Sequence, residues 1–126
     1  MPEYQDFVMV MTSCDDRKEA DRIAFDLLEK KLAACVNVFP IVRTHYLWKG
    51  KVVSGDEAVV IIKTELSKTE AIKTEIKEKH SYSNPEVLVI PIIGGSSDYM
   101  RWVSDVISDK KKKKTTRRSN RAVKKT

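Results

Sequence analysis

Two neighbouring segments decide the fold of this chain: Ala33-Ala34-Cys35-Val36-Asn37-Val38-Phe39-Pro40 and Thr44-His45-Tyr46-Leu47-Trp48-Lys49-Gly50-Lys51. The first is a short apolar strand that ends at a proline. In the second, Tyr46 and Trp48 fall on one face and their neighbours on the other, as in a β-strand. Lys49-Gly50 predicts a tight turn, because glycine supplies the positive φ that a hairpin needs. We therefore expect a long hairpin whose second strand runs over about 51–65.

The segments around this hairpin predict two more strands and three helices. The expected strands are 7–11, 33–48, 51–65 and 87–93, and the expected helices are about 16–31, 67–79 and 99–107. Asp16 with Glu19, and Ser67 with Glu70, have the spacing of capping boxes at the first two helix starts. This order predicts an α+β, ferredoxin-like (βαββαβ) fold with an antiparallel sheet, a long central β-hairpin and an extra C-terminal helix.

Length and cysteine content favour one domain in a reducing compartment. The chain has 126 residues, and Cys14 and Cys35 are too few for a disulfide framework. No apolar run approaches the roughly 20 residues of a membrane span. The first residues lack the basic and apolar blocks of a signal peptide. We therefore expect a cytoplasmic protein that does not interact with membranes.

The positive charge is concentrated at the C-terminal end. Residues 110–126 carry ten basic side chains and no acidic one, which leaves 14 basic against 18 acidic residues over 1–109, a net charge of −4. We expect a folded domain over 1–109 and a disordered basic tail over 110–126, because the tail has no hydrophobic face. Binding of nucleic acid or another polyanion would depend on that tail.

Three of the expected strands indicate an oligomer. The runs 7–11, 58–62 and 87–93 are apolar without alternation, which is typical of strands that are buried on both faces. The helices of a ferredoxin-like fold cover one face of the sheet. The last helix is too short for the whole second face, so we expect other subunits to cover it.

The order of several short motifs resembles the CutA divalent-ion tolerance family over about residues 7–107. The motifs are Ala33-Ala34-Cys35-Val36-Asn37, Tyr46-x-Trp48-x-Gly50-Lys51, Ile62-Lys63-Thr64, His80-x-Tyr82-x-x-Pro85-Glu86 and Asp98-Tyr99-x-x-Trp102. The resemblance implies a homotrimer of ferredoxin-like subunits whose long hairpins pair with neighbours. It also implies a role in copper and divalent-metal tolerance and no established enzymatic reaction.

Three positions depart from the pattern of that family. Members usually have proline where this chain has Ser81. Copper-linked members have cysteine in place of Thr12 and histidine in place of Lys79. Since two of the three residues credited with copper binding are missing, we expect this chain to bind Cu²⁺ or another divalent cation only weakly.

The metal-ligand candidates are few. The chain has two histidines, His45 and His80, and no Cys-x-x-Cys or paired-histidine spacing. His80 with Cys35, if the fold brings them together, is the best available pair, because Cu²⁺ binds nitrogen donors most strongly of the divalent series. The alternatives are a buried apolar Cys35, a His80 that hydrogen-bonds at a helix end, and a His45 that packs across strands.

A second candidate is a pocket between subunits. Tyr46, Trp48, Lys63 and Tyr82 combine aromatic surface with polar groups, which suits either a ligand cleft or plain subunit contact. A PII-like small-ligand sensor on the same trimeric plan is therefore an alternative function. No nucleophile elbow or phosphate-binding glycine loop is present, so we expect no enzyme activity and no organic cofactor.

Overall fold

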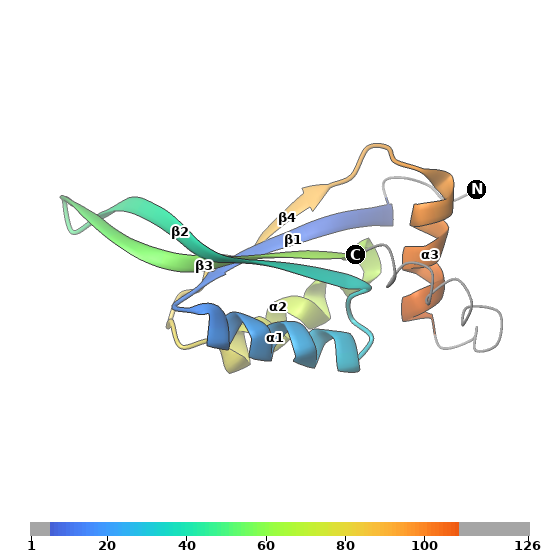
Figure 1. The fold of residues 1–126 in the computed structure, drawn as a ribbon, viewed down its shortest axis with the longest axis horizontal. Helices are drawn as coiled ribbons and strands as arrows, with labels where there is room; N and C mark the ends of the chain where they lie inside the picture. Colours follow the sequence, from blue (N-terminus) through green and yellow to red (C-terminus); the bar gives the residue numbers. More distant parts are fainter. Residues whose placement is uncertain (1–5, 109–126) are drawn as a thin grey trace.

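The computed structural model describes residues 6–108, which form a four-stranded sheet with helices packed against it (Figure 1). The elements are β1 (Phe7–Cys14), α1 (Arg17–Glu29), β2 (Cys35–Trp48), β3 (Lys51–Glu65), a 3-10 turn (Leu66–Lys68), α2 (Thr69–Lys79), β4 (Leu88–Pro91) and α3 (Ser97–Ile107). The predicted tail over 110–126 and the boundary at 109 lie outside the described residues. Among the helices described, none has the length and apolar character to cross a membrane.

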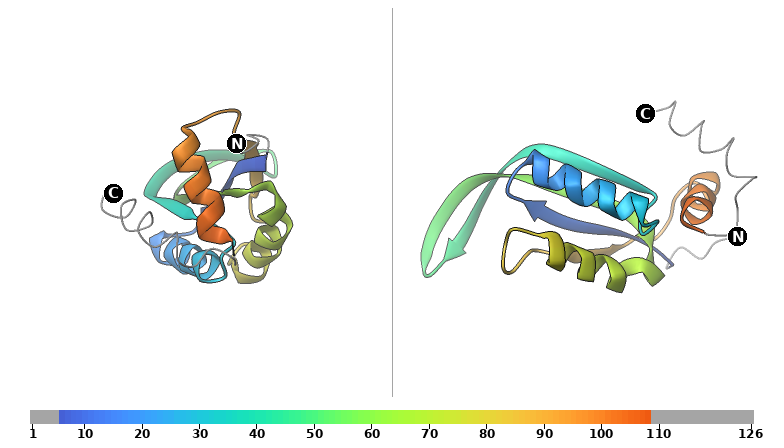
Figure 2. Two further views of the ribbon diagram at one scale, coloured as in Figure 1. Left: turned by 90° about the vertical axis from the view of Figure 1, so that its right-hand side faces the viewer. Right: turned by 90° about the horizontal axis from the view of Figure 1, so that it is seen from below.

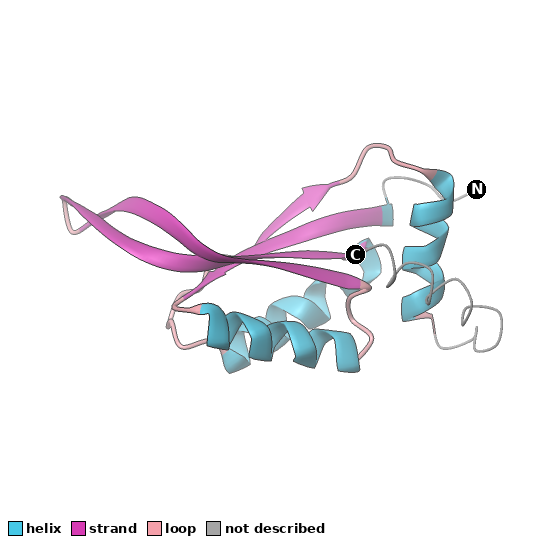
Figure 3. Ribbon diagram, viewed as in Figure 1, coloured by secondary structure: helices cyan, strands magenta, loops and turns pink. Residues whose placement is uncertain are grey.

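The strand order confirms the predicted ferredoxin-like fold. The sheet runs β2-β3-β1-β4, and all three neighbouring pairs are antiparallel. The connection from β1 to β2 contains α1, and the connection from β3 to β4 contains α2. Figures 1 and 3 show these two helices on the same face of the sheet.

The main core lies between that face and the two helices. Alternate side chains of β1 and β3 point into it and meet the apolar faces of α1 and α2, which lie side by side in Figure 2. Its buried members include Val8, Val10, Val60, Ile62, Ala20, Ile23, Leu27, Ile72 and Ile76. Asp16 caps α1 as predicted, since its carboxylate accepts from the backbone N–H of Glu19 at 2.9 Å.

The opposite face of the sheet is covered at one end only. There α3 packs Met100, Val103 and Ile107 onto Phe7 and Ala34, and Figure 2 shows it lying across the end of the sheet. Farther along, large apolar side chains on this face remain open to solvent. Phe39 is 50% exposed, and Leu88, which pairs with Met11, is 51% exposed.

The β2–β3 hairpin extends well past the rest of the sheet. β1 pairs with β3 only as far as Ala58, so the distal part of the hairpin, 42–57, pairs with itself alone (Figure 1). We call this part the arm. The register shifts between Phe39 and Val42, where the proline interrupts the ladder. Lys49 and Gly50 both have positive φ, 50° and 79°, and form the predicted turn.

Three local predictions differ from the structure. β1 continues to Cys14 instead of ending at residue 11, because its last residues still pair with β3. β4 is shorter than 87–93. The predicted capping box at Ser67 is wrong: the 3-10 turn precedes α2, and no side chain caps that helix.

Candidate functional site

Three potential ligands meet where β1 ends, α1 begins and α2 ends. Cys14 is the last residue of β1, Glu19 lies in the first turn of α1, and His80 is the C-cap of α2. One potential ligand atom from each side chain lies within 4.8 Å of the other two. The His80 and Glu19 side chains are 0% and 4% exposed, and Cys14 is 0% exposed. We call these three residues the 14–19–80 cluster.

The Glu19 carboxylate is held by backbone and side-chain donors. Its Oε1 accepts from the N–H of Asp15, the residue before the N-cap, at 3.0 Å. Ser81 donates its N–H to Oε2 at 2.6 Å and its hydroxyl to Oε1 at 3.0 Å. Burial alone would raise the pKa of Glu19, but these bonds and nearby His80 hold it below its ordinary value.

Ser81 thereby explains one of the departures in the sequence. The resemblance described above implies a proline at this position, and a proline has neither an N–H nor a hydroxyl to donate. In this chain both donors are used on the Glu19 carboxylate.

Hydrogen bonds fix the tautomer of His80. Its Nε2 lies 2.7 Å from the carbonyl oxygen of Ser13, which can only accept, so Nε2 carries the proton. Its Nδ1 accepts from the N–H of Tyr82 at 3.1 Å and lies 3.6 Å from Oε2 of Glu19. The expected hydrogen bond at a helix end is therefore present, and Nδ1 is the nitrogen that faces the carboxylate.

Cys14 is not an activated nucleophile. Burial, followed by the negative charges of Glu19 and Glu57, raises the pKa of its thiol to about 12. Catalytic cysteines have the opposite shift, because a thiolate is the reactive form. The raised pKa keeps the Cys14 thiol protonated at neutral pH, next to the imidazole of His80 and the carboxylate of Glu19.

The loop after α2 closes over the cluster and ties it to the base of the arm. Tyr82 donates its hydroxyl to Oε2 of Glu57 on β3 at 2.7 Å, and its ring lies 4.7 Å from that of His80. Burial and Glu57 raise the pKa of Tyr82. They also raise the pKa of Glu86.

The structure does not bring Cys35 and His80 together. Cys35 pairs with Lys63, which pairs with Met9, whereas His80 bonds to Ser13, four residues farther along β1. Four residues of strand correspond to about 13 Å. Cys35 instead contacts Tyr99, whose pKa is raised to about 12 by burial and by this thiol. The pairing failed because spacing in the sequence does not reveal the register of the sheet.

The four residues of the predicted pocket lie in three separate places. Tyr46 and Trp48 are on the arm, 48% and 60% exposed. Tyr82 belongs to the loop over the cluster. Lys63 lines a cavity of about 440 Å³ between the sheet and the N-terminal turn of α3. In the single chain these residues form no common pocket.

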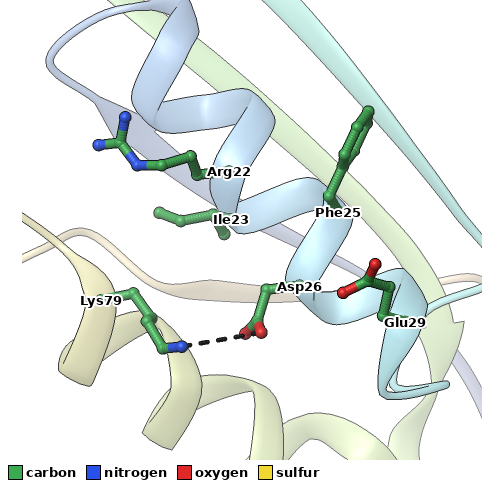
Figure 4. Close-up of a pocket in the computed structure, with 6 residues that line it drawn as sticks. All are labelled: Arg22, Ile23, Phe25, Asp26, Glu29 and Lys79. Atoms are coloured by element: carbon green, nitrogen blue, oxygen red, sulfur yellow. Dashed lines mark ion pairs between the residues drawn. The ribbon is translucent and has the colours of Figure 1, made fainter.

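Lys79, which replaces a histidine of copper-linked relatives, is directed away from the cluster. Figure 4 shows it in a cavity of about 450 Å³ at α1, where its Nζ lies 3.7 Å from Oδ1 of Asp26. Glu75 lies 4.0 Å from the same nitrogen and also pairs with Lys30. Lys79 thus belongs to an ion-pair network between α1 and α2.

Sequence reasoning missed Cys14 and Glu19 as members of the site. The spacing of Asp16 and Glu19 predicts only a capping role for Glu19, and Cys14 lies two positions beyond Thr12, where copper-linked members have cysteine. The signal available was that β1 could extend three residues farther, to Cys14. That extension places Cys14 on the same strand face as Thr12, pointing toward the helices.

Similar proteins correct the expected location. A solved structure from Archaeoglobus fulgidus, described as a periplasmic divalent cation tolerance protein CutA, matches with a TM-score of 0.79 and 35% identity, over 81% of this chain and 99% of that one. The Arabidopsis thaliana protein named "Protein CutA, chloroplastic" is 37% identical over 98 residues, 78% of this chain and 54% of that protein. The expectation of a simply cytoplasmic protein is therefore wrong, since unpaired cysteines are compatible with several compartments.

The sequence matches extend over nearly all of the described elements. The family described as "CutA1 divalent ion tolerance protein" matches residues 8–106, from β1 into α3. The "Divalent-cation tolerance protein CutA" of Pectobacterium atrosepticum is 40% identical over 99 residues, 79% of this chain and 90% of that protein. These names describe tolerance of cations rather than a reaction. The chain belongs to the CutA1 divalent ion tolerance protein family.

Proposed function

We propose that this chain is a non-enzymatic homotrimer that contributes to divalent-metal tolerance by binding Cu²⁺ or another divalent cation weakly through His80. The observation that carries the proposal is the position of His80. Its Nδ1 lies 3.6 Å from a buried carboxylate and within a group of potential ligands that includes a thiol. Imidazole nitrogen is a favourable donor for first-row divalent metals.

The hydrogen bonds of His80 account for weak binding. Both ring nitrogens are engaged, Nε2 with Ser13 and Nδ1 with Tyr82. A cation that takes Nδ1 has to displace the N–H of Tyr82, which loses a hydrogen bond of about 1 kcal/mol. Affinity is reduced by that amount and by the movement of the loop.

The trimer is supported by surface that a single chain leaves uncovered. The sheet face opposite α1 and α2 exposes Phe39 and Leu88, and the arm exposes Leu47 (74%), Trp48 (60%) and Val52 (72%). Exposed apolar surface of this extent marks an interaction site. We place the arms and open faces of two further copies against it.

Calorimetry with Cu²⁺ tests the role of His80. The full chain without a histidine tag should bind Cu²⁺ weakly at neutral pH, and His80→Gln should reduce the affinity by about tenfold or more. His45→Gln is the matched control, because His45 lies exposed on the arm and contacts Ser54. Equal loss in both variants, or none in either, contradicts a site at His80.

The small-ligand alternative is supported by the cavity at Lys63. Its volume is within the range of ligand sites, and its other lining residues include Phe7, Met9, Ile92 and Tyr99. Such a site suits an apolar molecule with one anionic group. The fluorescent anion anilinonaphthalene sulfonate should bind there, and Lys63→Met should weaken binding while Lys51→Met, on the arm, does not. Equal binding by all three proteins excludes this use of the cavity.

A further inference from the structure

We infer that Cys14, Glu19 and His80 together form one buried three-ligand site for a thiophilic divalent cation of the zinc type. This inference rests on the proposed function and specifies its ligands and the class of its cation. It adds a thiolate and a carboxylate to the single imidazole on which the proposal above depends.

The distances within the cluster are close to those of a coordinated ion. Bonds of about 2.0–2.3 Å in a tetrahedral site place the ligand atoms about 3.3–3.8 Å apart. Nδ1 of His80 and Oε2 of Glu19 are already 3.6 Å apart. No pair among the potential ligand atoms of the cluster exceeds 4.8 Å, so they have to approach one another by at most about 1 Å. Small side-chain rotations supply a movement of this size.

The groups around the ligands have the arrangement found in metal sites. A histidine that binds a metal through one nitrogen almost always donates its other N–H to a carbonyl or carboxylate. Nε2 of His80 already donates to the carbonyl oxygen of Ser13, which leaves Nδ1 directed at the cluster. Glu19 is likewise oriented by the N–H of Asp15. These contacts fix the direction of two ligands before any cation arrives.

Charge selects a divalent cation. Glu19 supplies one negative charge, Cys14 supplies a second when its thiol proton leaves to water, and His80 binds as the neutral imidazole. No electron is transferred. A 2+ ion therefore makes the buried site neutral, whereas a 1+ or 3+ ion leaves a net charge that is costly to bury.

The ligand types select among divalent cations. Ca²⁺ and Mg²⁺ take oxygen ligands and usually keep several waters. One thiolate, one imidazole and one carboxylate are a set that Zn²⁺ accepts, with a fourth position open to water. The sulfur ligand of Cys14 thus makes this site more selective for Zn²⁺ over Ca²⁺ and Mg²⁺ than a site built from carboxylates alone.

The loop over the cluster has to open for the cation to enter. The hydrogen bonds that have to break are the two that Ser81 donates to Glu19 and the one that the N–H of Tyr82 donates to Nδ1 of His80. Ser81, Ser83 and Asn84 are exposed, so this segment is a surface loop. Its bonds to the ligands are those that the cation replaces.

Cobalt(II) absorption tests this ligand set directly. Co²⁺ stands in for Zn²⁺ and gives a near-ultraviolet charge-transfer band when a thiolate binds it. The full chain without a histidine tag should show that band, and Zn²⁺ should abolish it. Cys14→Ser should lose the band, and Cys35→Ser, which changes the cysteine at the far end of the sheet, should keep it. Glu19→Gln and His80→Gln should each weaken Co²⁺ binding by about tenfold or more.

The outcomes separate this inference from the proposed function. Co²⁺ binding without the charge-transfer band, lost in His80→Gln but not in Cys14→Ser, overturns the thiolate site and leaves cation binding at His80 intact. A band that disappears in Cys35→Ser moves the site to the other cysteine and also overturns it. Absence of Co²⁺, Zn²⁺ and Cu²⁺ binding overturns both. If Cys14→Ser fails to fold, a band that persists in Cys35→Ser still assigns the thiolate to Cys14, because Cys14 is then the one cysteine left.

Discussion

Two buried threonines in this core differ in whether the side-chain hydroxyl has a hydrogen-bond partner. Thr12 and Thr64 are both 0% exposed. Thr64 donates its hydroxyl to the carbonyl oxygen of Leu32 at 2.7 Å, whereas the Thr12 hydroxyl has no hydrogen-bond partner among the described residues. A buried polar group without a partner destabilises the folded state, so these residues should respond differently to the same substitution.

Valine has the shape of threonine without its hydroxyl. We predict that Thr12→Val raises the free energy of unfolding by about 1 kcal/mol, since it removes an unpaired polar group. Thr64→Val, the matched control, should lower it by about 1 kcal/mol because it breaks a hydrogen bond. Denaturant unfolding of both variants measures the difference. A loss of stability in Thr12→Val similar to that in Thr64→Val would show that the Thr12 hydroxyl is paired.

The Glu19 carboxylate should make the stability of the folded protein depend on pH in the acidic range. Its pKa is lowered in the folded state, so its contribution is fully present above its ordinary value of 4.5 and is lost as pH falls through the folded value. We predict that Glu19→Gln is less stable than the parent at neutral pH and that the difference shrinks below about pH 4.5. Thermal melts over that range check this, with Glu29→Gln as a control on the same helix. A constant difference at all pH values would contradict it.

At the scale of elements, local sequence patterns correctly predicted features, such as a helix cap and a turn, that depend only on residues close together in the chain. The capping box at Asp16 and the turn at Lys49-Gly50 are confirmed because each is satisfied within a few residues. The cap at Ser67 failed because a 3-10 turn, in which Thr69 donates to Leu66, took its place. Tertiary packing overrides a short local signal of that kind.

The candidate site was predictable only in part for the same reason. His80 was identified from its motif. Cys14 and Glu19 lie next to His80 because of the register of β1 and the packing of α1 against α2. Neither can be predicted from the spacing of residues in a single sequence. Cys35 lies between apolar residues in the chain and Cys14 between polar ones, but what separates them in the structure is the end of the sheet that each occupies.

The arm provides a prediction at this scale. Trp48 is 60% exposed in the single chain, where its removal should cost less than about 0.5 kcal/mol. If neighbouring subunits bury it, Trp48→Ala should cost about 3–5 kcal/mol per site, the range for a deleted buried aromatic side chain. Thermal melts at several protein concentrations distinguish these cases. A melting temperature within a degree or two of the parent would mean that no neighbour covers Trp48.

At the scale of the whole molecule, basic and acidic side chains are unevenly distributed along the chain. Residues 110–126 carry ten basic side chains, and the preceding 109 carry a net charge of −4. Binding of a polyanion by this end of the chain stays a prediction. A salt-sensitive mobility shift with nucleic acid that is lost on truncation after Asp109 would support it, and a shift that survives truncation would place the binding elsewhere.

Three copies would bring three clusters into one particle, each built within one chain. The 14–19–80 cluster uses residues of β1, α1 and α2 alone, so its ligands are complete before assembly. The proposed trimer would cover the open sheet face and the arm, and the bond of Tyr82 to Glu57 connects the loop over the cluster to the base of the arm. We therefore expect one cation per chain rather than one per trimer.

Native mass spectrometry of the full chain, without a histidine tag and loaded with Zn²⁺ or Cu²⁺, tests the central claim most directly. We predict a particle of three times 14.4 kDa that carries three cations, and one from His80→Gln of the same mass that carries fewer. A folded monomer would contradict the trimer. A trimer that retains no cation, or that retains three in His80→Gln, would contradict the proposed site.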